Sequence, residues 1–291
     1  MQCSILFYFC HKVAKAEGEG VAINETNFPD KVFMEYVHSK FDSNGDNFLS
    51  KSELEQVIDI LVSPQPLYGD QDSVNFKGDI ESLKGIEYFP NLEKLDCSHN
   101  KLSVLDVSQN TALTELICQY NQLTDIKLGH NTALMYLYCA GNLLLKLDVS
   151  QNTNLIWLSC HSNQLYNIDL SQNKEFAVLE CYGNHFSVLD LSNNENLYAL
   201  ISGNEELSKI QFNIKAYDKE QLLQASQLHY YYTLYGNFES SGLQDLQNII
   251  STPMSGSYAK DSILKVIDPA KPATYKLKGK EFTITYVDTS A

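Results

Sequence analysis

The chain has 291 residues, 44% of them hydrophobic, which is enough apolar material for one large domain or two ordinary ones. Thirty-six acidic residues against 21 Lys residues give a net charge of −15, and the sequence contains no Arg. A protein that follows nucleic-acid phosphates needs a positive surface, usually with Arg side chains, and anionic membranes attract the same kind of surface. The composition therefore disfavours nucleic acid and anionic membranes as partners.

The first 20 residues resemble the remnant of a signal peptide. Apolar residues 3–10 precede Val13-Ala14-Lys15-Ala16, which is similar to an A-x-A cleavage site. The apolar part is short and no Lys precedes it, so an ordinary disordered N-terminus is the alternative. No other stretch has the roughly 18 apolar residues that a membrane span needs. We therefore expect a secreted or cell-surface protein without membrane insertion.

Two helices flanking an acidic loop are expected over residues 21–66. Residues 28–41 are apolar at helical spacing, and a second amphipathic helix is expected from Lys51 to Leu61. The loop 42–53 between them fits an EF-hand, with oxygen-bearing side chains at positions 1, 3 and 5 and a Glu at position 12. Two departures weaken this interpretation: Asn47 replaces the usual Gly, and the chain has one such loop where EF-hands usually pair. A structural Ca²⁺ is one hypothesis and an ion-free helix-loop-helix cap is the other. The candidate ligands are Asp42, Asn44, Asp46, Phe48 and Glu53.

A repeat of 21 residues dominates the middle of the chain. Cys recurs at Cys97, Cys118, Cys139, Cys160 and Cys181, and two Asn series with the same period run from Asn100 to Asn184 and from Asn110 to Asn194. Leu residues fill the positions between them. Turns of equal length stack into a parallel sheet over a shared core. We therefore predict an α+β fold in which residues 67–213 form a solenoid.

The Cys series has several interpretations: a metal site, a nucleophile, disulfides or small buried side chains. Neighbouring turns lie about 4.8 Å apart with parallel side chains, whereas a disulfide needs converging Cβ atoms about 3.8 Å apart. Metal ligands must also converge on one point. The spacing favours buried thiols that act as small hydrophobic residues.

Residues 214–291 are expected to form a mixed C-terminal cap. A helix is predicted over residues 219–228, followed by a Tyr-rich run at residues 230–235. Strand-like segments follow at residues 263–267, 274–277 and 282–287, and the last two flank a predicted hairpin turn.

Several stretches resemble the leucine-rich-repeat surface proteins of gut Bacteroidetes and Firmicutes. They are Asn27-Phe28-Pro29-Asp30, residues 84–92, 95–102 and 105–111. The resemblance covers residues 23–213 and is more distant to internalins, which also place an EF-hand-like cap before their repeats. It implies non-catalytic adhesion or recognition, and it supplies no site residues.

Side chains at alternating positions of each strand should face outward on the concave sheet. The only Trp of the chain falls at such a position, among several Tyr residues. Exposed aromatic clusters are typical of protein interfaces and sugar-binding platforms. The predicted contact residues for a protein or glycan ligand are Ile117, Tyr136, Tyr138, Trp157, His161 and Tyr182.

The repeat shows no catalytic set, so no enzymatic activity is expected. The alternatives are an accessory module of an extracellular enzyme and a calcium-dependent docking module, because residues 42–61 resemble half of a dockerin.

Overall fold

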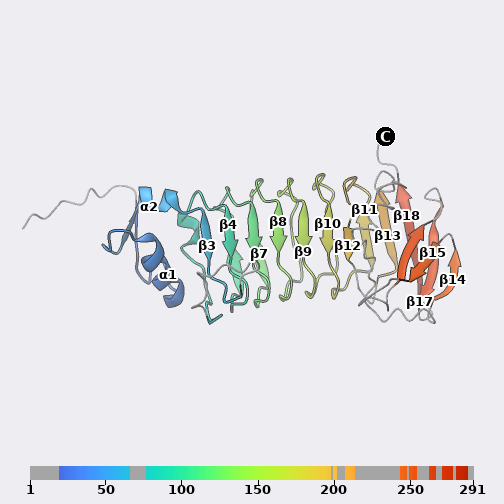
Figure 1. Cartoon of the computed structure of the whole chain (residues 1–291), viewed down its shortest axis with the longest axis horizontal. Coiled ribbons are helices and arrows are strands. Elements are labelled where there is room, and N and C mark those ends of the chain that lie inside the picture. The colour runs from blue at the N-terminus through green and yellow to red at the C-terminus, as the bar shows by residue number, and fades with distance from the viewer. Residues whose placement is uncertain are drawn as a thin grey trace, which may run out of the picture.

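The computed structural model describes residues 20–65, 77–197, 199–201, 207–213, 243–247, 249–253, 262–266, 271–277 and 280–287. They form an elongated stack, with the N-terminal helices at one end and the C-terminal strands at the other (Figure 1). The predicted signal segment, most of the join before residue 77, the helix over 219–228 and the Tyr-rich run lie outside the described residues.

Seven short parallel strands form the main sheet, in the order β12-β10-β9-β8-β6-β4-β3. Their bounds are β3 (Asp59–Leu61), β4 (Lys94–Asp96), β6 (Glu115–Ile117), β8 (Tyr136–Tyr138), β9 (Trp157–Ser159), β10 (Val178–Glu180) and β12 (Ala199–Ile201). From β4 onward the register pairs residues 21 apart, such as Leu116 with Leu137. The predicted solenoid of 21-residue turns is confirmed.

A second series of strands follows the first within several turns. β5 (Val104–Asp106) pairs with β7 (Asp125–Lys127), and β11 (Val188–Leu191) pairs with β13 (Lys209–Asn213). The C-terminal strands extend this second layer, because β18 (Lys280–Val287) adds to β13 in parallel. β17 (Ala273–Leu277) forms the predicted hairpin with β18 and also pairs with β14 (Leu243–Gln247). A separate hairpin joins β15 (Ile249–Pro253) to β16 (Ser262–Val266).

The core consists of Leu and Cys side chains that repeat in every turn. Cys97, Cys118, Cys139, Cys160 and Cys181 are all fully buried and free. Burial raises the pKa of the Cys139 thiol to about 12, which keeps it protonated. The interpretation of the series as small buried hydrophobic residues is confirmed.

Two columns of Asn side chains hold consecutive turns together. Asn142 donates to the carbonyl oxygens of Cys118 (3.1 Å) and Cys139 (3.0 Å), and its Oδ1 accepts from the N–H of Leu123 (3.0 Å). In the second column, Asn173 donates to the carbonyl of Asn152 at 2.7 Å. Because buried backbone groups need partners, a loop position that lies inside the stack requires such an amide.

The N-terminal cap begins with β1 (Gly20–Ala22), which pairs with β2 (Phe48–Ser50) inside the acidic loop. The first predicted helix is confirmed as α1 (Lys31–Phe41), which starts at the N-cap Asp30. The second prediction is wrong in length, because α2 (Lys51–Gln56) ends before β3 begins. Residues 57–62 contain Val57, Ile58, Ile60 and Val62, whose branched side chains favour an extended strand over a helix. The last part of the predicted helix is therefore the first strand of the main sheet.

Candidate functional site

The predicted contact residues lie on the outer face of the main sheet. Tyr136 and Tyr138 are the first and last residues of β8, and Trp157 opens β9. The middle Leu of each strand points into the core, so its two neighbours point outward. The register places Tyr136 beside Trp157, and the rings of Tyr138 and Trp157 are 6.1 Å apart at an angle of 45°.

Two apolar side chains on the same face of the sheet are buried beside these aromatic rings, outside the main core. Ile117 is fully buried and Val178 is 3% exposed, although both occupy outward-facing strand positions. The register pairs Ile117 with Tyr138 and Val178 with Trp157. The expectation that Ile117 is exposed is therefore wrong, because neighbouring outward side chains cover it. Ile117 therefore supports the neighbouring aromatic side chains.

Trp157 carries an unsatisfied polar group. Its indole Nε1 is buried and has no hydrogen-bond partner among the described residues. A buried N–H without an acceptor usually costs about 1–3 kcal/mol. A small rearrangement of the ring on binding would let this donor reach an acceptor, since Trp combines a large apolar face with one polar handle.

His–Tyr ring pairs continue the surface beyond the strand ends. His161 stacks on Tyr182 with ring centroids 4.2 Å apart and an interplanar angle of 8°. His99 stacks on Tyr120 at 4.6 Å. Partial burial lowers the pKa of His161, and it also lowers the pKa of His99 against the opposing effect of Asp96. Both rings are therefore neutral and apolar at neutral pH.

Polar pairs flank the aromatic residues along the sheet. On one side Lys94 and Glu115 form an ion pair at 3.3 Å. On the other, the hydroxyl of Ser159 donates to Glu180 at 2.8 Å. An apolar centre with a polar rim is the usual composition of a protein interface.

Sequence analysis missed three exposed apolar residues on the same turns. Leu143 (45% exposed), Leu145 (60%) and Tyr166 (58%) follow β8 and β9 along the chain, outside the main sheet, and Tyr166 stacks on His185 at 5.0 Å. Departure from the repeat was the available signal, because the preceding turn carries Gln122 and Thr124 where Leu143 and Leu145 stand. Leu145 and Tyr166 occupy the repeat position of Ser103 and Thr124, which directly precede β5 and β7, so this apolar group lies towards the second series of strands.

The acidic loop is closed by its own hydrogen bonds. Asn47 has the positive φ (62°) that this position of an EF-hand requires. The two carboxylate oxygens of Asp42 accept from the N–H groups of Asp46 (3.1 Å) and Asn47 (2.9 Å). Asn44 accepts from Asp46 as well, and Phe48 begins β2.

Glu53, the predicted bidentate ligand, is engaged on both oxygens. One accepts from the backbone and hydroxyl of Ser43, and the other from the backbone and hydroxyl of Ser50. The Ser43 hydroxyl, with the other donors, outweighs burial and lowers the pKa of Glu53 to about 2. Within the part of the chain that the structure describes, no three His, Cys, Asp or Glu side chains converge as metal ligands do. Ser43 and Ser50 donate to the Glu53 oxygens that a calcium ion would take, and calcium binding by the loop stays a prediction.

The repeated inward Leu and Cys residues, the two Asn columns and the parallel sheet decide the fold. It is a leucine-rich-repeat solenoid. Among solved structures, the chain is similar to the functional domain of InlJ from Listeria monocytogenes, which includes a cysteine ladder, with 25% identity and a TM-score of 0.39. That match covers 68% of this chain and 53% of InlJ, so the chain spans about half of that domain. Internalin C2 of the same organism matches at 20% identity and a TM-score of 0.41, over 72% of this chain and 95% of the other.

The leucine-rich-repeat domain of APL1B matches at 16% identity and a TM-score of 0.36, over 50% of this chain and 56% of the other. No protein-family model matches the chain, and no curated protein matches it. Since these TM-scores lie below 0.5, the function is argued from the residues of this chain.

Proposed function

We propose that the chain is a non-catalytic recognition protein that binds a protein partner on the outer face of its main sheet. The decisive observation is the cluster of Tyr136, Tyr138 and Trp157 beside buried, outward-facing Ile117 and Val178. Contiguous apolar surface on this scale is typical of contact sites, and Tyr and Trp supply large contact area at low entropic cost. The polar pairs Lys94–Glu115 and Ser159–Glu180 beside the cluster give the composition of a protein interface, which favours a protein over a glycan.

The described surface offers little to catalysis. His161 Nδ1 lies 3.1 Å from the Ser162 hydroxyl, which resembles a base beside a nucleophile. A working pair also needs a third group that orients the base, and no described carboxylate bonds to His161. The ring instead stacks on Tyr182, as a contact surface requires.

We also propose that the protein acts outside the cell or on its surface, in line with the resemblance of residues 1–20 to a signal peptide. Among the described residues, no helix is both long enough and apolar enough to span a bilayer.

The test is to screen the full chain against arrays of proteins and of glycans. The binding of variants to each partner found in this way is then compared with that of the wild type. Trp157→Ala combined with Tyr138→Ala should weaken binding of a protein partner at least about tenfold, since such aromatic residues are frequent hot spots. The matched control is Val188→Ala, which truncates an exposed apolar side chain of β11, outside the main sheet. Binding that survives the double substitution unchanged, or that occurs to glycans alone, contradicts the proposal.

A further inference from the structure

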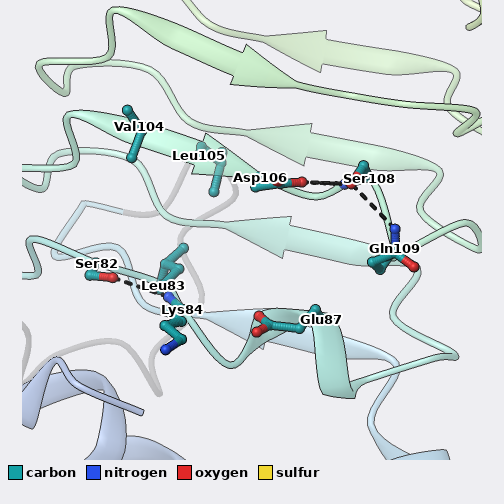
Figure 2. A pocket seen from close by; sticks show the side chains of 9 residues that line it. All are labelled: Ser82, Leu83, Lys84, Glu87, Val104, Leu105, Asp106, Ser108 and Gln109. Atoms are coloured by element: carbon teal, nitrogen blue, oxygen red, sulfur yellow. Dashed lines mark hydrogen bonds between the residues drawn. The ribbon is translucent and has the colours of Figure 1, made fainter. Parts of the chain in front are cut away.

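A groove lies between the first two turns of the solenoid, away from the aromatic surface. Its volume is about 350 Å³. Figure 2 shows that residues 82–87 form one wall and β5 with the turn after it forms the other. The lining residues are Ser82, Leu83, Lys84, Glu87, Val104, Leu105, Asp106, Ser108 and Gln109.

The wall formed by β5 is an unpaired strand edge. Among the described strands β5 pairs with β7 alone, on the side away from the groove. The carbonyl of Ser103 and the N–H of Val107 bond to the β7 turn, so the odd-numbered residues face β7. Backbone groups alternate in direction along a strand. The N–H and C=O groups of Val104 and Asp106 therefore point into the groove.

The opposite wall does not pair with this edge, because its own N–H groups are satisfied elsewhere. Asp30 Oδ2 accepts from the N–H groups of Glu81 (2.8 Å) and Ser82 (3.2 Å). Glu87 accepts from the N–H of Gly85 at 2.7 Å. No hydrogen bond joins residues 82–87 to the backbone of Val104 or Asp106 among the described contacts. The groove thus separates two turns that elsewhere in the stack are joined.

The same layer accepts an added strand at its other end. There β18 pairs with β13 in parallel over five residues, from Lys209 with Thr283 to Asn213 with Val287. That pairing extends the layer at its C-terminal end, whereas no strand among the described residues lies against β5 at the N-terminal edge. An unpaired edge beside an open groove is the geometry in which peptides bind by strand addition.

The side chains around the groove define what such a strand should carry. Val104 is 62% exposed and offers an apolar contact. Glu87 and Asp106 contribute two carboxylates to the groove. Lys127 of β7 pairs with Asp106 at 3.4 Å, and Lys84 donates to the carbonyl of Thr26 at 3.2 Å, so Glu87 is the carboxylate without a described ion pair. Partial burial opposes the ionisation of Asp106, yet the hydrogen bonds from Ser108 and Lys127 lower its pKa, so it is charged at neutral pH. The net charge of −15 adds to this local preference for a basic partner.

We propose that this groove binds an extended segment of a partner protein, with alternating apolar and basic residues, as a third strand on β5. The backbone of the segment pairs with Val104 and Asp106. Its apolar side chains face Leu83 and Leu105 in the groove, and its basic side chains lie on the face that the segment shares with Val104 and Asp106. This site is separate from the aromatic surface and does not depend on the function proposed for it.

The test uses the full chain and fluorescently labelled acetyl-Val-Lys-Val-Lys-Val-amide, with binding followed by anisotropy. Two control peptides carry Glu in place of Lys, or N-methyl groups on alternate backbone amides. Each should bind about tenfold more weakly, because each removes the charge match or the strand hydrogen bonds. Hydrogen exchange at Val104 and Asp106 should slow when the unmodified peptide binds.

Variants of β5 locate the site. Val104→Pro removes the N–H that faces the groove, and Pro is tolerated on such an edge, so peptide affinity should fall about tenfold. Val104→Thr keeps that N–H and should bind nearly as well as the wild type. The Trp157→Ala and Tyr138→Ala double variant should bind the peptide unchanged. Equal affinity for the N-methylated and unmodified peptides, or no protection of β5 amides, would overturn the proposal. The charged side chains beside β5 would then serve only to keep this strand edge unpaired.

Discussion

Asn173 shows how single side chains hold neighbouring turns together. Its amide donates to the carbonyls of Val149 (3.0 Å) and Asn152 (2.7 Å), and the residue is fully buried. Asn173→Ala removes both bonds between the turns, while Val149 and Asn152 each still accept from an N–H of their own turn, so we expect a loss of about 1–3 kcal/mol in unfolding free energy. Urea denaturation measures this loss. The matched control is Asn154→Ala, whose amide makes one exposed bond to Thr132, and it should cost less than about 1 kcal/mol. Equal losses at the two positions would contradict this role.

Glu53 makes the stability of the N-terminal cap depend on pH. Its pKa falls from the ordinary value of 4.5 to about 2, because Ser43 and Ser50 donate to the ionised form. A group with a lowered folded-state pKa stabilises the protein above its unfolded pKa, and this contribution disappears as the pH falls towards 2. We therefore expect the cap to lose stability between about pH 5 and pH 2.

The control for this pH dependence is Glu53→Gln, which keeps the size of the side chain and removes its charge. At pH 7 it should destabilise the cap by about 1–2 kcal/mol, and it should flatten the stability profile at low pH. Amide exchange of α2 at several pH values measures both effects. If the wild type and Glu53→Gln lose stability in the same way as the pH falls, Glu53 is not the source of this pH dependence.

The five core Cys residues should be chemically inert in the folded protein. Only the thiolate reacts, and burial raises the pKa of Cys97, Cys118, Cys139 and Cys160. In a variant with Cys3→Ser and Cys10→Ser, a thiol reagent should modify the remaining residues only as fast as the chain unfolds. Rapid modification under native conditions would show that the column is accessible.

Asp30 joins two elements as well as capping one. Its Oδ1 accepts from the N–H groups of Val32 and Phe33 at the start of α1, and its Oδ2 accepts from residues 81 and 82 of the first turn. Asp30→Ala should therefore cost more than an ordinary N-cap, about 2–3 kcal/mol.

Hydrogen exchange separates the two roles of Asp30, because α1 and residues 77–89 should both exchange faster in Asp30→Ala. Ser50→Ala is the comparison, since Ser50 caps only α2. If Asp30→Ala affects α1 alone, the link to the first turn contributes nothing.

Periodic elements were predictable from the sequence because their cause is local and repeated. The strands around Leu116 and Leu137, the Asn columns and the terminal hairpin follow from spacing alone. β3 was not predictable in the same way. Residues 59–61 continue an amphipathic helical pattern, and only the pairing of Ile60 with Leu95 across the sheet makes the extended form more stable. The parallel addition of β18 to β13 also depends on contacts between residues far apart in the chain.

The position of the candidate site could be predicted from the sequence, but the exposure of each of its side chains could not. Sequence spacing placed Tyr136, Tyr138 and Trp157 on one surface, as the register confirms. It could not show that Ile117 is buried beside them, because coverage depends on the size and orientation of neighbouring side chains. The groove beside β5 arises where the first turn departs from the repeat, and no periodic pattern reports such a departure.

At the scale of the whole molecule, the inward side chains of the stack provide stability and the outward side chains provide recognition. The inward Leu, Cys and Asn residues repeat almost unchanged, since each must fit the turns on both sides. The outward residues are free to differ: Tyr136, Tyr138 and Trp157 make β8 and β9 aromatic, whereas β6 and β10 each carry one Glu and one branched apolar residue. One sheet therefore presents a continuous surface whose chemistry varies along the stack.

The central claim is that the partner sits on the surface that carries Trp157, and the chain contains no other Trp. The most direct measurement is the tryptophan emission of the full chain with and without a protein partner recovered from the array. If the account is correct, a saturating partner without Trp shifts the emission to shorter wavelength and protects it from acrylamide quenching. Emission and quenching that stay unchanged at saturation would contradict the account.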